Sequence, residues 1–124
     1  VIQADGGTRT AAITGAWVAL RIACEHLLLA GAITQSPLTG QVAAISCGIY
    51  QKQAVLDLDY DEDSTAEIDA NFILTAAGEL VEVQATGEEH PFSRSSLNEM
   101  LDLAESGCSQ LFALQQRAIQ DSNL

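Results

Sequence analysis

The pattern of hydrophobic and polar positions predicts two long helices at the ends of the chain. Residues 8–30 carry apolar side chains around nearly the whole circumference of a helix, which is typical of a helix buried on several sides. Gly31 is a natural C-terminal stop for it. Residues 93–120 keep helical spacing through Gly107 without a change of phase, which predicts one long helix rather than two short ones.

The start of the second helix has two candidate caps. Ser93 is a plausible N-cap, and Ser96 followed by Glu99 forms a competing capping box. Both place the helix start within one turn, so the choice affects only its first residues.

Between the helices, four segments read as strands. These are residues 42–50, 54–60, 67–74 and 79–85, with a turn at 51–53 between the first two. Strict alternation in 67–74 predicts a half-buried strand with one apolar face. Four consecutive strands predict an antiparallel meander, and the order helix, strands, helix predicts an α+β domain with its helices on one face of the sheet.

Composition restricts the partners and the setting. The 124 residues carry a net charge of −12 with five basic side chains, which argues against this chain alone gripping a polyanion. We see neither a signal peptide nor 18 continuous apolar residues, so we expect no membrane partner. Three isolated cysteines (Cys24, Cys47 and Cys108) predict buried or half-buried thiols in a reducing cytosol.

The first candidate site is the segment Asp5-Gly6-Gly7-Thr8-Arg9 at the predicted start of the first helix. A helix N-terminus presents unpaired N–H groups to an anion, and glycine lets the backbone approach a ligand closely. Arg9 adds a planar fork of donors suited to phosphate oxygens. The segment matches neither common glycine-rich nucleotide fingerprint, so a purely structural turn stays open.

The second candidate site is the acidic segment that begins at Asp57, in which every second residue up to Asp63 is an aspartate. Crowded carboxylates repel unless a cation neutralises them, and hard oxygen ligands suit Mg²⁺, Mn²⁺ or Ca²⁺. A calcium-binding EF-hand loop is excluded because its sixth position holds Glu62 and its twelfth Ile68. A Mg²⁺-type site and a solvated acidic loop remain as alternatives.

Taken together, three segments resemble the ribonuclease PH family of bacteria. They are residues 1–16, residues 57–64 with Glu67 and Asp69 following, and residues 82–88 with 91–93. The similarity covers essentially the whole chain in order. Ala85 is a departure, since the family has glycine there, and family members are about twice as long.

The resemblance implies a ribonuclease PH-type α+β fold, similar to domain 2 of ribosomal protein S5, with a buried N-terminal helix. Residues 1–124 would form the C-terminal half of that domain, and an absent N-terminal half would carry most of the RNA-contacting basic surface. The implied activity is a cytoplasmic phosphorolytic 3′→5′ exoribonuclease that trims tRNA precursor 3′ ends and releases nucleoside diphosphates. The implied assembly is a hexameric ring, a trimer of dimers.

The resemblance also assigns roles to residues. Gly7, Thr8 and Arg9 would hold inorganic phosphate, the attacking nucleophile. Asp57 and Asp63 would hold Mg²⁺ (or Mn²⁺), with Asp63 passing a proton and Asp61 as a further ligand. We expect this chain alone to be inactive. The alternatives are an inert structural ring subunit of the same fold and an acidic Mg²⁺- or Ca²⁺-binding module.

Overall fold

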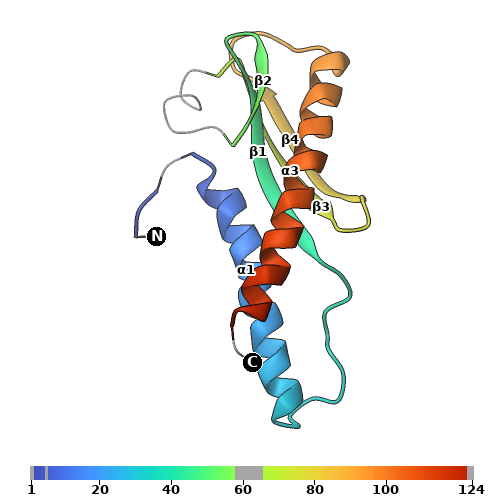
Figure 1. Cartoon of the computed structure of the whole chain (residues 1–124). Helices are drawn as coiled ribbons and strands as arrows, with labels where there is room; N and C mark the ends of the chain where they lie inside the picture. Colours follow the sequence, from blue (N-terminus) through green and yellow to red (C-terminus); the bar gives the residue numbers. More distant parts are fainter. Residues whose placement is uncertain (1, 5, 58–65, 123–124) are drawn as a thin grey trace.

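The computed structural model describes residues 2–4, 6–57 and 66–122. Within these residues, a helix at each end of the chain flanks four consecutive strands, and Figure 1 shows how these elements are arranged. The elements are α1 (Thr8–Leu29), β1 (Val42–Tyr50), β2 (Gln53–Leu56), β3 (Ile68–Thr75), β4 (Leu80–Gly87) and α3 (Arg94–Gln120). Both predicted helices and all four strands are therefore present, and α3 runs unbroken through Gly107.

The ends of the helices follow from local chemistry. Ser93 is the N-cap of α3, since its Oγ accepts the Ser96 N–H at 3.1 Å, and this settles the choice between the two candidate caps. At the C-terminal end of α1, Gly31 has a φ of 76°, and its N–H donates a hydrogen bond to the Leu28 carbonyl. Glycine adopts this left-handed conformation without a steric penalty, so the predicted stop is confirmed.

The sheet is antiparallel throughout, but it is not the predicted meander. The strand order is β2-β1-β3-β4, so β3 pairs with β1 and not with β2. A two-residue turn at Gln51 and Lys52, both with positive φ, closes the β1–β2 hairpin. Because β2 has only four residues, it covers one end of β1, while β3 pairs with β1 along nearly its full length.

The predicted strand 54–60 corresponds to β2, which begins one residue earlier, at Gln53, and ends at Leu56. Asp57 leaves the extended conformation because it adopts a left-handed φ of 56°, and residues 58–60 of the prediction lie outside the described residues. The Asp57 N–H bonds to the Ser46 carbonyl at 2.7 Å, which anchors this turn to β1.

α3 covers one face of the sheet with a closely packed core. The alternate residues of β3 that point toward it, from Ile68 to Leu74, are all buried, as the alternation predicted. A Cβ on Gly107 would overlap Ile45 Cδ1, so glycine lets α3 approach β1 closely. The buried core comprises Ala43, Ile45, Cys47, Ile49, Ile68, Ala70, Phe72, Leu74, Met100, Ala104 and Cys108.

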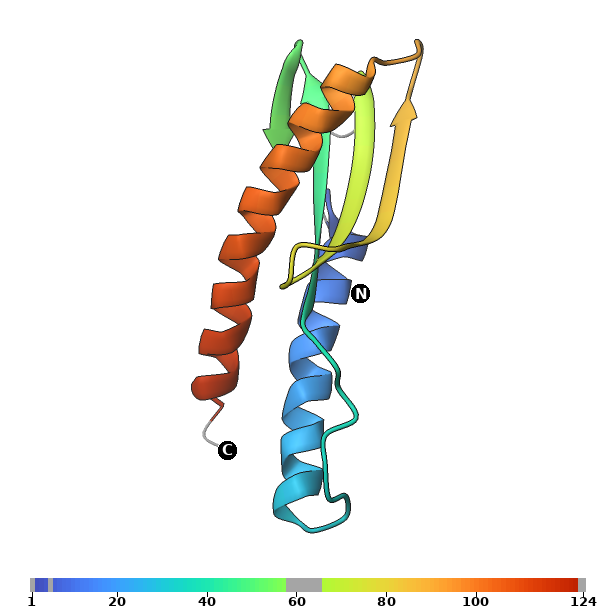
Figure 2. The same ribbon diagram turned by 90° about the vertical axis from the view of Figure 1, so that its right-hand side faces the viewer.

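α1 lies on the other side of β1 from α3, which Figure 2 shows, and not on the same face as predicted. Its polar side chains bind the end of β1 that β2 leaves uncovered. Thr14 Oγ1 donates to the Ala44 carbonyl and accepts the Ala44 N–H, at 3.1 and 2.9 Å. Trp17 Nε1 donates to the Gly40 carbonyl at 3.0 Å. These side chains take the place of a further strand along that edge.

α1 is also not buried, in contrast to the prediction. Only Thr10, Trp17 and Cys24 are buried among its 22 residues. Leu20, Leu27 and Leu29 are 52%, 44% and 73% exposed. The helix is nevertheless joined to α3 by a buried amide, since Gln115 Nε2 donates to the carbonyls of Thr14 and Val42.

Candidate functional site

The structure brings the two predicted sites together at Gly7 and Asp57, fifty positions apart. Gly7 is the N-cap of α1 with a left-handed φ of 74°. A Cβ placed on it would lie 3.2 Å from Asp57 Oδ1, so a larger residue would be strained in its backbone and crowded by the carboxylate. Both residues line one hollow of about 350 Å³ between α1, β1 and α3.

The start of α1 has the electrostatics of an anion site. Thr8 is its first residue, and no acidic side chain lies in its first turn. The partial positive charge of the helix N-terminus is therefore not neutralised within that turn. The Asp57 carboxylate lies close to this helix start, so an anion bound here needs further cations in the site.

Arg9 points across the sheet toward β4. Its Nη2 donates to Glu82 Oε2 at 2.8 Å, with the two side chains 52% and 38% exposed. A guanidinium has five N–H donors, so this ion pair leaves others for a second oxygen ligand. The geometry places Arg9 at the same helix start as Gly7 and Thr8 but does not bring it against Asp57.

The predicted metal ligands are only partly within the described structure. Asp57 is exposed at the end of β2, whereas Asp61 and Asp63 lie outside the described residues. Within residues 2–4, 6–57 and 66–122, no three His, Cys, Asp or Glu side chains are grouped to hold a metal. The assignment of a metal to this segment stays a prediction.

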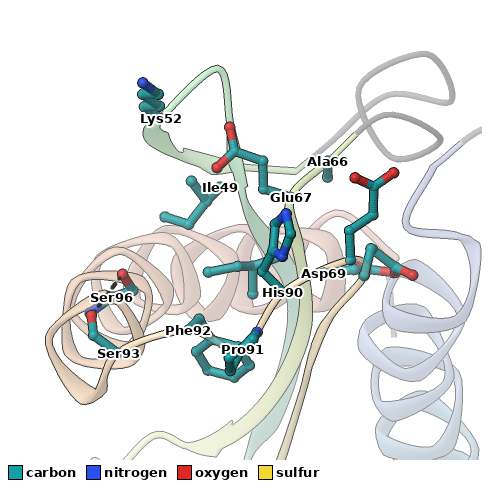
Figure 3. A pocket seen from close by; sticks show the side chains of 13 residues that line it. Ile49, Lys52, Ala66, Glu67, Asp69, His90, Pro91, Phe92, Ser93 and Ser96 are labelled. Atoms are coloured by element: carbon teal, nitrogen blue, oxygen red, sulfur yellow. Dashed lines mark hydrogen bonds between the residues drawn. The ribbon is translucent and has the colours of Figure 1, made fainter.

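A larger hollow, of about 790 Å³, lies at the opposite end of β3 from its turn into β4 (Figure 3). Lys52 lines it from the β1–β2 turn, and Ser93 and Ser96 line it from the first turn of α3. Acidic side chains and His90 complete a polar rim. None of Gly7, Thr8, Arg9 and Asp57 lines this hollow, so size alone would misplace the candidate site.

The three cysteines are free and buried, which confirms the prediction of buried thiols. Burial raises the pKa of Cys47 to about 12, and the negative charges of Cys108 and Asp57 add to the shift. Burial likewise raises the pKa of Cys108 to about 11. A thiol held protonated in this way is a poor nucleophile, so these two groups are structural.

Sequence reasoning missed two residues next to the site, Ser46 and Glu82. Ser46 is a polar residue in a nine-residue strand whose interior is buried throughout, and that mismatch is the signal that could have found it. Glu82 alternates with the apolar residues of β4, but nothing in the sequence pairs it with Arg9, 73 positions away.

Comparisons with known proteins agree with this architecture. Residues 40–107 match the family model described as 3′ exoribonuclease family, domain 2. The chain is 59% identical to the ribonuclease PH of Caulobacter vibrioides over 119 residues, 96% of this chain and 50% of that protein. It is 57% identical to the ribonuclease PH of a Synechococcus species over 121 residues, 98% of this chain and 49% of that one.

A solved structure supports the fold. The crystal structure of rice (Oryza sativa) Rrp46 superposes with a TM-score of 0.75 at 20% identity, over 97% of this chain and 51% of that one. The chain thus spans about half the length of the curated relatives it matches, and the match falls on their C-terminal half. By its sequence and its fold, this chain belongs to the 3′ exoribonuclease family, and it corresponds to the C-terminal half of the ribonuclease PH proteins that it matches.

Proposed function

We propose that the Gly7–Asp57 site is the phosphate side of a phosphorolytic 3′→5′ exoribonuclease that trims tRNA precursor 3′ ends. The observation that carries this is the convergence of a glycine N-cap, a helix start without acidic residues and a carboxylate. Inorganic phosphate would attack the terminal phosphodiester, and the terminal nucleotide would leave as a nucleoside diphosphate. Two anions must then be held close together, which needs oriented donors and positive charge.

Each residue has a part in this proposal. The amides of Gly7 and Thr8 and the guanidinium of Arg9 bind and orient phosphate in line with the scissile bond. Asp57, with Asp63 and Asp61 from the segment outside the described residues, would hold Mg²⁺ or Mn²⁺. The metal would stabilise negative charge on the leaving 3′ oxygen when bound. Asp63 would pass the proton that the leaving oxygen takes up.

The second half of α1 offers a surface on which the rest of the enzyme could pack. We propose that the apolar second half of α1 packs against a polypeptide equivalent to the N-terminal half of the relatives. Its exposed leucines and the 50% coverage of those relatives support this. That half would also supply basic charge that a chain of net charge −12 lacks. Assembly into a cytoplasmic hexameric ring of dimers belongs to the same proposal.

The test uses a chimera in which this chain replaces the matching half of the Caulobacter vibrioides ribonuclease PH. We expect release of nucleoside diphosphates from tRNA precursors only when phosphate is present. Arg9→Ala should raise the KM for phosphate by about 10- to 100-fold, because it removes a charged hydrogen bond to the nucleophile. Arg117→Ala, which removes an exposed arginine in the last turn of α3, is the matched control and should leave that KM unchanged.

Other outcomes would support the alternatives. A chimera that assembles but never releases nucleoside diphosphate would favour an inert structural subunit. Metal binding to the chain without any effect of phosphate would favour the acidic metal-binding module. Asp63→Asn should nearly abolish turnover while RNA binding persists, and a near-normal rate would remove Asp63 from the mechanism. The 124-residue chain by itself should release no nucleoside diphosphate.

A further inference from the structure

The ion pair between Arg9 and Glu82 joins the start of α1 to a strand that is distant in the sequence. Arg9 Nη2 donates to Glu82 Oε2 at 2.8 Å, across 73 positions of the chain. Arg9 is the cation that we propose to bind phosphate, whereas Glu82 has no role in the chemistry proposed above. A change at Glu82 therefore acts first on the guanidinium of the phosphate site.

The register of the sheet determines which face carries Glu82. Val83 pairs with Phe72, which is fully buried in the core that α3 covers. Successive residues of a strand point to opposite faces, so Glu82, which pairs with Ile73, points to the face on which α1 lies (Figure 2). Because β4 is paired with β3 at this residue, the carboxylate extends from a fixed backbone position.

Arg9 leaves α1 on the side that faces away from Asp57. Thr10, Ala11 and Thr14 line the hollow to which Asp57 contributes. With 3.6 residues per turn, successive residues are about 100° apart, so Arg9 lies about 200° from Ala11 and about 140° from Thr14. The Arg9 guanidinium and the Asp57 carboxylate therefore flank the helix start from different sides.

The position of Arg9 is unfavourable for a cation that has no partner. The partial positive charge of a helix N-terminus repels a cation in the first turn. The arginine side chain is also long and flexible, and it is 52% exposed here. The Glu82 carboxylate supplies the opposite charge and an acceptor, which restricts the guanidinium to the β4 side of the helix start. The bond uses one of five N–H donors, so others are kept for a second oxygen ligand.

The arrangement also gives alternating charges when an anion is bound at the helix start. From β4 toward β2 the order is Glu82, Arg9, the anion, and then Asp57 with the cation that we propose it holds. In this order the Glu82 carboxylate lies behind the guanidinium and is further from the anion than Arg9 is. Attraction of the anion to Arg9 therefore exceeds its repulsion by Glu82.

We infer that Glu82 is a positioning residue of the phosphate site. Its carboxylate holds the Arg9 guanidinium on the β4 side of the helix start, so that phosphate binds between Arg9 and the Asp57 side. This rests on the proposed function of the Gly7–Asp57 site. The ligand is inorganic phosphate, and Glu82 acts on it only through Arg9.

The test measures the KM for phosphate and the KM for RNA in the same chimera. Glu82→Ala should raise the KM for phosphate by about two- to fivefold, because an exposed ion pair stabilises one arrangement of Arg9 only modestly. The KM for RNA should change less than about 1.5-fold, since Glu82 acts on phosphate alone. Glu82→Gln keeps an oxygen that accepts the Arg9 N–H and should recover most of the phosphate affinity. The Glu82 side chain is 38% exposed, so both variants should fold.

A double-mutant cycle with Arg9 separates positioning from a general effect of charge. In an Arg9→Ala background, Glu82→Ala should not raise the KM for phosphate further, because the guanidinium that it positions is gone. Glu105→Ala removes the same charge from an exposed position of α3 and is the matched control, which should leave both constants unchanged.

Three outcomes would overturn the inference. A lower KM for phosphate in both Glu82 variants would show that the carboxylate competes with phosphate for Arg9. A rise in both Michaelis constants, or the same rise with and without Arg9, would show that Glu82 does not act on phosphate through the guanidinium.

The result separates the inference from the proposed function. An Arg9→Ala effect on phosphate without any Glu82 effect would leave the function standing and remove the positioning role. A chimera whose RNA cleavage is independent of phosphate would overturn both.

Discussion

The two long helices of this chain differ in how well their composition matches their burial. α1 is the more apolar helix, yet only three of its 22 residues are buried, and one of those is Thr10. α3 is more polar, yet it buries Met100, Ala104, Gly107 and Cys108 along one stripe against the sheet. An apolar stripe at the right spacing finds its partner within this chain, whereas a helix that is apolar all round needs more surface than the chain provides.

The difference extends to how each helix is held. α3 is held by close apolar packing. α1 is held in its first half by the hydroxyl bonds of Thr14 to β1 and by the indole bond of Trp17 to Gly40, just before β1. By length and composition alone, α1 would be long and apolar enough to cross a membrane. Its hydrogen bonds to the sheet, and the superposition of 97% of the chain on rice Rrp46, account for the helix as part of the fold.

The largest effect on stability should come from the close apolar packing of α3. Met100→Ala removes a fully buried side chain from the face of α3 that packs on the sheet, so we expect a loss of about 2–5 kcal/mol in the free energy of unfolding. Urea denaturation followed by circular dichroism measures it. Met100→Leu keeps most of the volume and should cost less than about 1.5 kcal/mol. A loss below 1 kcal/mol for the alanine variant would mean that α3 is not a close-packed element.

The hydrogen bonds that hold α1 should contribute less to stability. Thr14→Val keeps the shape of the side chain but leaves the N–H and carbonyl of Ala44 without this partner, at a cost of about 1–3 kcal/mol. The same urea titration applies, and Thr14→Ser, which retains the hydroxyl, should restore most of the stability. If valine and serine behave alike, the α1–β1 bonds contribute nothing to holding the helix.

Alkaline pH should weaken the packing beneath α3 by a smaller amount. The fold raises the pKa of Cys47 to about 12 and that of Cys108 to about 11, so both thiols stay protonated there while the unfolded chain ionises near pH 9. The two thiols therefore leave the free energy of unfolding unchanged well below pH 9. Above that pH they lower it, by about 1 kcal/mol per thiol at pH 10. Urea midpoints between pH 7 and pH 10 measure the slope, and Cys108→Ala should reduce it. An unchanged slope in that variant would contradict the assignment.

Parts of the fold could be predicted from the sequence where the pattern of apolar residues within one helix or strand identifies its buried face. Alternation in β3 and the helical stripe of α3 identify their buried faces without any knowledge of neighbours. The strand order could not be predicted in this way, because it depends on β2 ending at Leu56, where Asp57 turns left-handed. The side of the sheet that α1 occupies depends on the bonds of Thr14 and Trp17, which no local pattern encodes.

The candidate site divides along the same line. Glycine, hydroxyl and arginine at a helix start are a local signal, so Gly7, Thr8 and Arg9 could be proposed from the sequence alone. Gly7 lies close to Asp57, and Ser46 of β1 is hydrogen-bonded to both Thr10 and the Asp57 N–H. These are long-range outcomes of both segments packing beside β1. Asp61 and Asp63 lie outside the described residues, so their role rests on the resemblance.

The smallest effect on stability should come from the exposed half of α1, and it tests the comparison most directly. Leu27→Ser with Leu29→Ser alters side chains that are 44% and 73% exposed, so the free energy of unfolding of this chain should change by less than about 0.5 kcal/mol per site. The same double variant should weaken capture by the N-terminal half of the Caulobacter vibrioides ribonuclease PH, measured by co-purification and analytical ultracentrifugation. Leu80→Ser, which removes an exposed leucine of β4, is the control and should leave that capture intact. Equal capture by both variants would show that α1 is not the surface on which the other half packs.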